Sequence, residues 1–133
     1  MTRFHTVVLP VDVELFASDG SEVRTLAAAA PGSLAHFLLR PGQVSAAVQH
    51  RTVTELWYIT AGHGRMWRRD DEGEEIVELV PGTSLSIPLG TAFQFRCDGD
   101  APLEIVGATM PPWPGEDEAF VVEGTWQPSR YAE

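Results

Sequence analysis

The chain has 133 residues and a formal net charge of -10 at pH 7, because 19 acidic residues outnumber 9 basic ones. This length indicates one domain with a sizeable core, and the negative charge argues against nucleic acid and anionic membranes as partners. The sequence has no lysine and no asparagine, which excludes Schiff-base chemistry on lysine and N-glycosylation sequons.

Cysteine usage and the N-terminal segment indicate a reducing, intracellular setting. Cys97 is the single cysteine of the sequence, so an internal disulfide cannot form. The N-terminal segment lacks a basic stretch followed by a long apolar run, and no apolar run reaches membrane-spanning length. We therefore expect a cytoplasmic protein that binds neither membranes nor nucleic acid.

The first part of the chain predicts extended segments separated by turns. Thr6–Phe16 is rich in β-branched residues, and its proline suits an edge strand. Ser18–Ser21 predicts a turn and Glu22–Leu26 a short strand, whereas the alanine run before Pro31 is too short for a helix. Ser33–Leu39 is apolar enough for a buried strand that ends in a Pro-Gly turn.

Strand follows strand in the rest of the chain. Ala46–His50 and Thr54–Thr60 form a central pair, and a glycine hairpin leads to Arg65–Arg69 and an acidic, solvated tip. Further strands are predicted at Glu75–Val80, Ser84–Pro88, Ala92–Cys97 and Leu103–Met110. Many short, closely spaced strands without helical periodicity predict an all-β sandwich or barrel.

Two sets of turn glycines and polar residues in this region resemble the motifs of the cupin superfamily. The first motif, G-x5-H-x-H-x3-4-E-x6-G, is matched by Gly42, Val48, His50, Glu55 and Gly62. The second motif, G-x5-P-x-G-x2-H-x3-N, keeps every interval and is matched by Gly82, Pro88, Gly90, Phe93 and Cys97. The resemblance implies a double-stranded β-helix, a jelly-roll barrel with a pocket at one end, over roughly Ser33–Met110.

The departures from these motifs bear on metal binding. Metal-binding cupins take ligands from four motif positions, which here hold Val48, His50, Glu55 and Phe93. Catalytic metal centres usually keep at least three protein ligands, so a third would have to come from outside the motifs. His36 is the one candidate whose strand we expect to line the barrel. We expect no cofactor, while a divalent Fe, Mn, Ni or Zn ion held by His50 and Glu55 stays an alternative.

Strand alternation turns one set of side chains toward the barrel interior. Val48 and His50, Glu55 and Trp57, and Phe93 and Phe95 would form an aromatic pocket around one polar couple. One interpretation is a satisfied buried pair in which carboxylate and ring stabilise each other. The other is an acid/base pair: apolar surroundings favour the neutral forms of both groups and suit them to proton transfer. The resemblance allows this, because some cupins are metal-free isomerases or epimerases.

Other candidates have simpler interpretations. Cys97 predicts a small buried hydrophobe, and Trp67 predicts a half-buried strand residue. Arg65, Arg68 and Arg69 beside the acidic tip predict a solvated, charge-compensated hairpin without a functional role.

The C-terminal composition shifts to prolines, tryptophans and acids. Its aromatic residues predict that this tail packs on the barrel or on a partner subunit. We divide the chain into N-terminal strands over residues 1–32, a barrel core over 33–110 and the tail over 111–133.

The function we predict is that of a homodimeric, small-molecule-binding cupin. It would be metal-poor and either a binding module or a metal-free isomerase or cyclase. Its catalytic pair would be His50 and Glu55, and its ligand would contact Val48, His50, Glu55, Trp57, Phe93, Phe95 and His36. The alternative is a metal-dependent, dioxygenase-like enzyme that uses His50, Glu55 and a third ligand.

Overall fold

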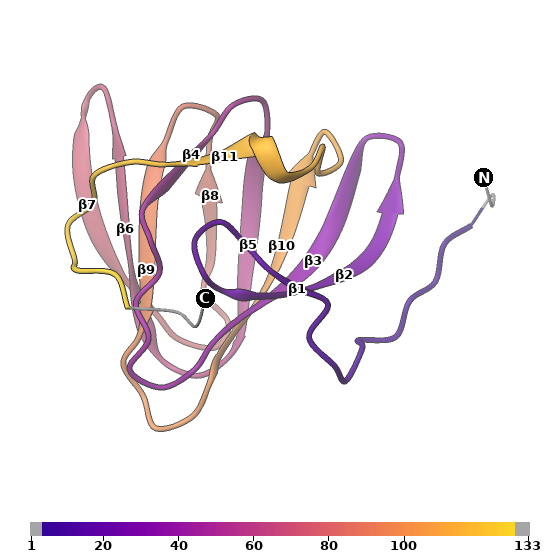
Figure 1. The fold of residues 1–133 in the computed structure, drawn as a ribbon, viewed down its shortest axis with the longest axis horizontal. Coiled ribbons are helices and arrows are strands. Elements are labelled where there is room, and N and C mark those ends of the chain that lie inside the picture. The colour runs from indigo at the N-terminus through magenta and orange to yellow at the C-terminus, as the bar shows by residue number, and fades with distance from the viewer. Residues whose placement is uncertain (1–3, 130–133) are drawn as a thin grey trace.

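The computed structural model describes residues 4–129, which form two antiparallel sheets facing each other (Figure 1). The first sheet has the strand order β1-β2-β3-β10-β5-β8, and the second has the order β11-β4-β9-β6-β7. The strands of the first sheet are β1 (Leu15–Phe16), β2 (Glu22–Ala29), β3 (Gly32–Leu39), β5 (Thr54–Ala61), β8 (Ser84–Ile87) and β10 (Leu103–Met110). Those of the second are β4 (Val48–His50), β6 (Gly64–Asp70), β7 (Gly73–Leu79), β9 (Ala92–Cys97) and β11 (Ala119–Val121).

The core lies between the two sheets, as period-two alternation predicts. In β5, Glu55, Trp57 and Ile59 are buried, whereas Leu56 and Tyr58 face outward and are exposed. The inward side chains of both sheets form one cluster of buried residues that fills the space between them. The prediction of an all-β jelly-roll barrel is confirmed by this architecture.

The turn glycines of both motifs hold backbone conformations that other residues avoid. Gly42, Gly62, Gly82 and Gly90 all have φ between 82° and 94°. At Gly62, between β5 and β6, a Cβ would also lie 2.4 Å from the Pro102 carbonyl oxygen. This glycine therefore lets the loop before β10 pack against the hairpin.

The N-terminal segment departs from its prediction. Thr6–Phe16 was expected to be a strand, but only Leu15–Phe16 pairs, with β2. The preceding residues are held by other contacts: the Val11 carbonyl accepts from Arg24 Nη2, and the Glu14 carboxylate accepts from the Thr25 N–H and hydroxyl. We call residues 4–14 the N-terminal arm. The alanine run continues β2 to Ala29, past a register shift between Thr25 and Ala28.

The tail lies along the barrel's own second sheet. After a single 3-10 turn, η1 (Glu116–Glu118), β11 pairs antiparallel with β4. It forms the edge strand of the second sheet, beside β4 in Figure 1. Further on, Trp126 packs against Ala47, Trp67 and Ala92, so these side chains on the outer face of the sheet are buried. Within residues 4–129, no helix has the length and apolar character needed to cross a membrane.

Candidate functional site

One imidazole and one carboxyl group of the first motif meet inside the barrel. His50 ends β4 and Glu55 lies at the start of β5, and their Nε2 and Oε1 atoms are 3.2 Å apart. Only 5% of the His50 side chain and 3% of the Glu55 side chain is exposed. The two groups are therefore close enough to share a proton and are shielded from bulk water.

The turn that joins these two residues is stabilised by the tail. The Glu118 carboxylate accepts from the backbone N–H groups of Thr52 and Val53 and from the Thr52 hydroxyl. The Arg51 N–H donates to the Glu118 carbonyl. A residue more than sixty positions away thus fixes the turn that sets the distance between His50 and Glu55, and no local sequence pattern predicts it.

The second oxygen of Glu55 is held by an indole. Trp57 lies two residues further along β5 on the same face, and its Nε1–H donates to Glu55 Oε2 at 2.9 Å. Gly107 of β10 makes room for this pair: a Cβ there would lie 2.6 Å from Phe37 Cε2 and 3.2 Å from Glu55 Oε2. The backbone of β10 therefore approaches the couple as closely as it does because residue 107 has no side chain.

Aromatic rings surround the couple. The His50 ring makes edge contacts with Phe93 and Trp113, each with ring centroids 5.2 Å apart. Trp57 makes edge contacts with Phe93 and Phe95 at 5.8 and 4.9 Å. Val48, Trp57, Phe93 and Phe95 all belong to the buried core cluster. The structure thus brings the residues of the predicted pocket together, but as packed side chains in contact.

Trp113 is the residue of this enclosure that the sequence did not single out. It comes from the tail and 43% of it is exposed, so it lies between His50 and solvent. Its backbone N–H donates to Ser33 Oγ, which is 2.7 Å from Thr109 Oγ1. Thr109 is the cross-strand partner of Glu55, so this polar row links the tail to the couple.

Burial shifts both titrations of the couple toward the neutral forms. It raises the pKa of Glu55 to about 8, against the Trp57 hydrogen bond, which lowers it, and the Asp19 carboxylate raises it further. Burial lowers the pKa of His50 to about 4, against the Glu118 carboxylate, which raises it. At neutral pH the couple is therefore a carboxylic acid beside a neutral imidazole, and not an ion pair.

Asp19 is a second buried acid that the sequence placed in a simple turn. Its carboxylate accepts from the Ser21 N–H and hydroxyl, and its backbone carbonyl accepts from the Ala46 N–H. Burial raises its pKa, while the bonds from Ser21 lower it. The core near Glu55 therefore contains two acids whose charged forms are both disfavoured.

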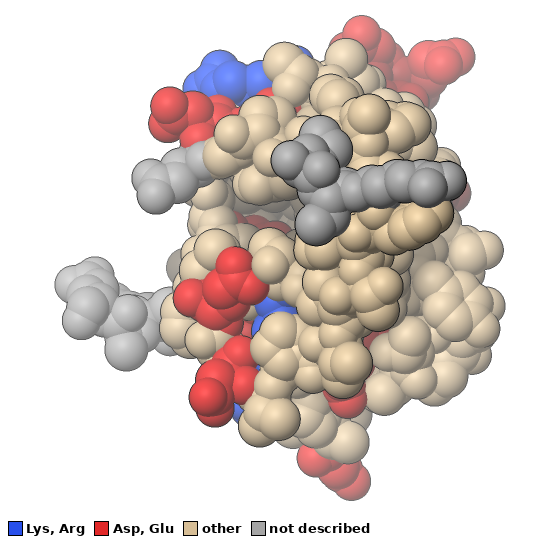
Figure 2. Space-filling view, turned by 90° about the vertical axis from the view of Figure 1, so that its right-hand side faces the viewer, with Lys and Arg blue, Asp and Glu red and all other residues tan. Residues whose placement is uncertain are grey.

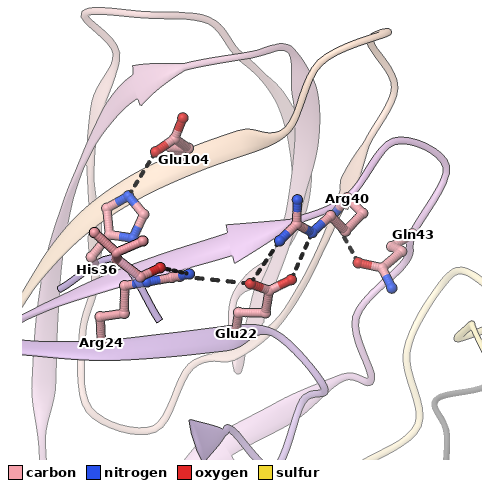
Figure 3. A network of polar contacts seen from close by, with 7 residues as sticks. Glu22, Arg24, His36, Arg40, Gln43 and Glu104 are labelled. Atoms are coloured by element: carbon pink, nitrogen blue, oxygen red, sulfur yellow. Dashed lines mark hydrogen bonds and ion pairs between the residues drawn. The ribbon is translucent and has the colours of Figure 1, made fainter. Parts of the chain in front are cut away.

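His36 does not belong to this site, and the expectation that its strand turns it inward is wrong. Phe37 and Leu39 of β3 pack in the core, so His36 faces the opposite side of the sheet. On this outer face of the first sheet its Nε2 is 3.0 Å from Glu104 Oε1. Arg24 and Glu22 lie on the same face (Figure 3). It is buried in a polar network outside the barrel and contacts neither member of the couple.

The donor set does not fit a metal ion. His50 and Glu55 are the two ionisable groups at the four motif positions, and Val48 and Phe93 offer no ligand atom. Among residues 4–129, no group of three or more His, Cys, Asp or Glu side chains is arranged to hold a metal. The third ligand that the metal-dependent alternative requires has no support in this part of the chain.

Comparisons with known proteins agree with this architecture. A family model described as "Cupin domain" matches residues 35–109. The xanthan biosynthesis protein XanB of Xanthomonas campestris pv. campestris is 28% identical over 88 residues, which are 66% of this chain and 18% of that protein. The chain therefore spans less than a fifth of that curated relative.

Two solved structures illustrate the similarity of fold. An oxalate decarboxylase variant of Bacillus subtilis superposes with a TM-score of 0.75 at 16% identity, over 92% of this chain and 33% of that one. The capsular polysaccharide assembling protein CapF of Staphylococcus aureus gives a TM-score of 0.67 at 18% identity, over 88% and 34%. At these identities the likeness is one of fold.

Proposed function

Because the chain belongs to the cupin domain family, we propose that it binds a small molecule at the barrel mouth and uses His50 and Glu55 for metal-free proton transfer. The observation that carries this proposal is the 3.2 Å contact between an imidazole and a carboxyl group that are both buried. A purely structural pair would serve as well in its charged form, whereas these surroundings favour the neutral one.

The neutral couple can donate and accept protons in the same pH range. Glu55 carries its proton below about pH 8, and His50 has a free lone pair above about pH 4. Glu55 would donate to a ligand oxygen while His50 accepts a proton from an adjacent carbon. A proton leaves and a proton returns, so an isomerisation, epimerisation or cyclisation of this kind needs no further co-reactant.

A ligand would reach the couple from the side that Trp113 covers. This residue packs on His50 from the tail and is partly exposed, which supports a cover that is displaced when a ligand enters. The relatives suggest what to screen first, because XanB is named for xanthan biosynthesis and CapF for capsular polysaccharide assembly. Reducing sugars and sugar acids are therefore the first candidate ligands.

Solvent-exchange catalysis tests the proposal. A panel of sugars and sugar acids is incubated with the protein in D2O, and proton NMR follows deuterium entry at the carbon next to the carbonyl. We expect exchange by the wild type in the presence of EDTA, and its loss in both His50→Ala and Glu55→Gln. Exchange that persists in either variant, or that requires an added divalent metal, would contradict the proposed function.

We also propose that a second copy of the chain covers the outer face of the first sheet. Leu34, Leu56 and Tyr58 are exposed there and lie on adjacent cross-strand rungs with Ala108 and Val106. The N-terminal arm carries further exposed apolar side chains, among them Val8, Leu9 and Val11.

Charge supports a second copy as the occupant of that face. Figure 2 shows broad uncharged surface on the side that carries the arm, interrupted by acidic clusters. The acids on the outer face of the first sheet are paired, Glu22 with Arg24 and Arg40, and Glu104 with His36. In a chain with a net charge of -10, such a surface is where two copies can approach with least repulsion.

A further inference from the structure

Arg68 lies on the inner face of β6 at the barrel rim, where the sequence predicted a solvated hairpin. Met66 packs in the core, and Arg68, two residues later, lies on the same face of the strand. Its cross-strand partners are Phe93 on β9 and Glu75 on β7. The Arg68 side chain is only 18% exposed, so this arginine lies at the rim of the interior, next to the hairpin tip.

The guanidinium group is held in place but incompletely paired. Nη1 donates to the Ser86 carbonyl at 2.7 Å, and Nη2 donates to Glu75 Oε1 at 2.6 Å. Nε is buried and has no hydrogen-bond partner among the described residues. Nε and Nη2 form the edge of a guanidinium that binds a carboxylate through two parallel hydrogen bonds, and here one of the two positions is unfilled.

A ligand at this edge would compete with the Glu75 carboxylate, which is easily displaced. The Glu75 side chain is 62% exposed, so it can exchange its single contact with Arg68 for water at little cost. A cavity of about 320 Å³ opens beside Arg68. A second cavity, of about 360 Å³, lies under the tail and is separate from it. The lining of the cavity beside Arg68 includes two arginines, Arg68 and Arg69, and three acids of the β6–β7 hairpin, Asp70, Glu74 and Glu75.

This cavity is one strand away from the buried couple in the first sheet and two strands away in the second. In the second sheet, Phe93 is both the rung partner of Arg68 and the ring that contacts His50. In the first sheet, the Ser86 carbonyl that holds the guanidinium precedes Ile87, the rung partner of Glu55. Neighbouring strands lie about 5 Å apart, so a small molecule held here can extend toward the couple.

We propose that this rim cavity is a carboxylate-binding subsite in which Arg68 takes a ligand carboxylate through Nε and Nη2 and releases Glu75. Because the rest of the chain is strongly acidic, an inward-facing arginine is what an anionic ligand needs to approach the barrel mouth. The ligand class is a small carboxylic acid with a hydroxylated or carbonyl-bearing remainder. This choice of ligand rests on the proposed function, whereas the carboxylate contact does not.

The test follows the Nε–H resonances of the arginines in 15N-labelled protein during titration with sodium malonate, with sodium chloride at equal ionic strength as the reference. Arg68→Lys identifies the Arg68 resonance, and Arg65→Lys on the same hairpin is the matched control. We expect a saturable shift of the Arg68 resonance with malonate only. Glu75→Gln should bind malonate at least threefold more tightly, because it removes the competing carboxylate.

The inference is overturned if the Arg68 resonance moves no more with malonate than with chloride, if all arginine resonances move alike, or if Glu75→Gln does not tighten binding. Repeating the titration in His50→Ala separates this inference from the proposed function. In the wild type, malonate binding without deuterium exchange would support the Arg68 subsite and contradict the proposed function. Deuterium exchange without malonate binding would support proton transfer by His50 and Glu55 and contradict the subsite.

Discussion

Glu55 is a buried acid whose environment disfavours its charge, and this links its proton to the stability of the fold. Its pKa is raised to about 8 in the folded protein, from a usual value near 4.5. The folded state therefore binds the proton more tightly, and the stabilisation is complete below about pH 4.5 and is lost as the pH rises through 8. His50 contributes to stability with the opposite pH dependence. Its pKa is lowered to about 4, so its contribution is complete above about pH 6.5 and is lost as the pH falls through 4.

The first prediction concerns the pH dependence of unfolding. The free energy of unfolding of the wild type should fall between pH 6.5 and pH 9, where only Glu55 of the couple still titrates. Glu55→Gln should flatten this part of the profile, because the amide has no proton to lose. Urea denaturation at a series of pH values measures both curves, and an equally steep fall in the variant would show that another group is responsible.

The second prediction concerns the glycine against which the couple packs. Gly107→Ala should cost about 1–3 kcal/mol, because its Cβ would overlap Phe37 and crowd the Trp57–Glu55 hydrogen bond. Gly99→Ala is the matched control, since a Cβ there meets nothing closer than 3.5 Å. Chemical denaturation compares the two, and equal effects would mean that the contact at residue 107 is not restrictive.

At the scale of elements, the tail completes the site from outside the barrel motifs. Glu118 binds the turn between His50 and Glu55, β11 pairs with β4, and Trp113 lies over the His50 ring. Removing the whole tail would therefore also remove a strand of the second sheet. Single substitutions are needed to distinguish the covering of His50 by Trp113 from the stabilisation of the turn by Glu118.

The third prediction is that Trp113→Ala raises the pKa of His50 from about 4 toward its usual 6.5, because water then reaches the ring. Trp126→Ala is the control: it removes an indole of the same tail that packs on Trp67 and Ala92, on the outer side of the sheet. Imidazole carbon shifts followed by NMR report the titration. An unchanged His50 pKa in Trp113→Ala would show that Trp113 does not exclude water.

The inner faces of the strands near the motifs could be predicted from the sequence, because strict alternation determines which side chains share a face. That reasoning placed Val48, His50, Glu55, Trp57, Phe93 and Phe95 together. It failed at His36. Apolar residues occur on both faces of β3, so the sequence does not indicate which face turns toward the core. It also missed Arg68, although counting two residues from the buried Met66 would have identified its face.

The contributions of Glu118 and Trp113 were beyond sequence reasoning. Both act through contacts with residues more than sixty positions earlier in the chain. The tail has no motif that predicts which strand it will join, and its composition indicates only that it packs. The packing of the interior could not be predicted either, because side-chain volume within a barrel depends on how the two sheets approach each other.

At the scale of the whole molecule, the fourth prediction is a dimer. Sedimentation of the wild type should give twice the chain mass at micromolar concentration, and Tyr58→Glu should shift it toward the monomer by placing a charge on the outer face of the first sheet. Ile76→Glu is the matched control, because Ile76 is similarly exposed but lies on β7 of the other sheet. A monomeric wild type, or equal dissociation by both variants, would contradict the proposed interface.

The central claim is that His50 and Glu55 form a neutral, metal-free couple inside the barrel. The most direct measurement is an NMR titration of protein purified without chelator and carrying 13C-labelled histidine and glutamate. We expect the His50 imidazole to titrate near pH 4 and the Glu55 carboxyl near pH 8, with Glu55→Gln removing the second transition. Titration of His50 near 6.5 together with Glu55 near 4.5, or His50 shifts that change when EDTA removes a bound ion, would contradict it.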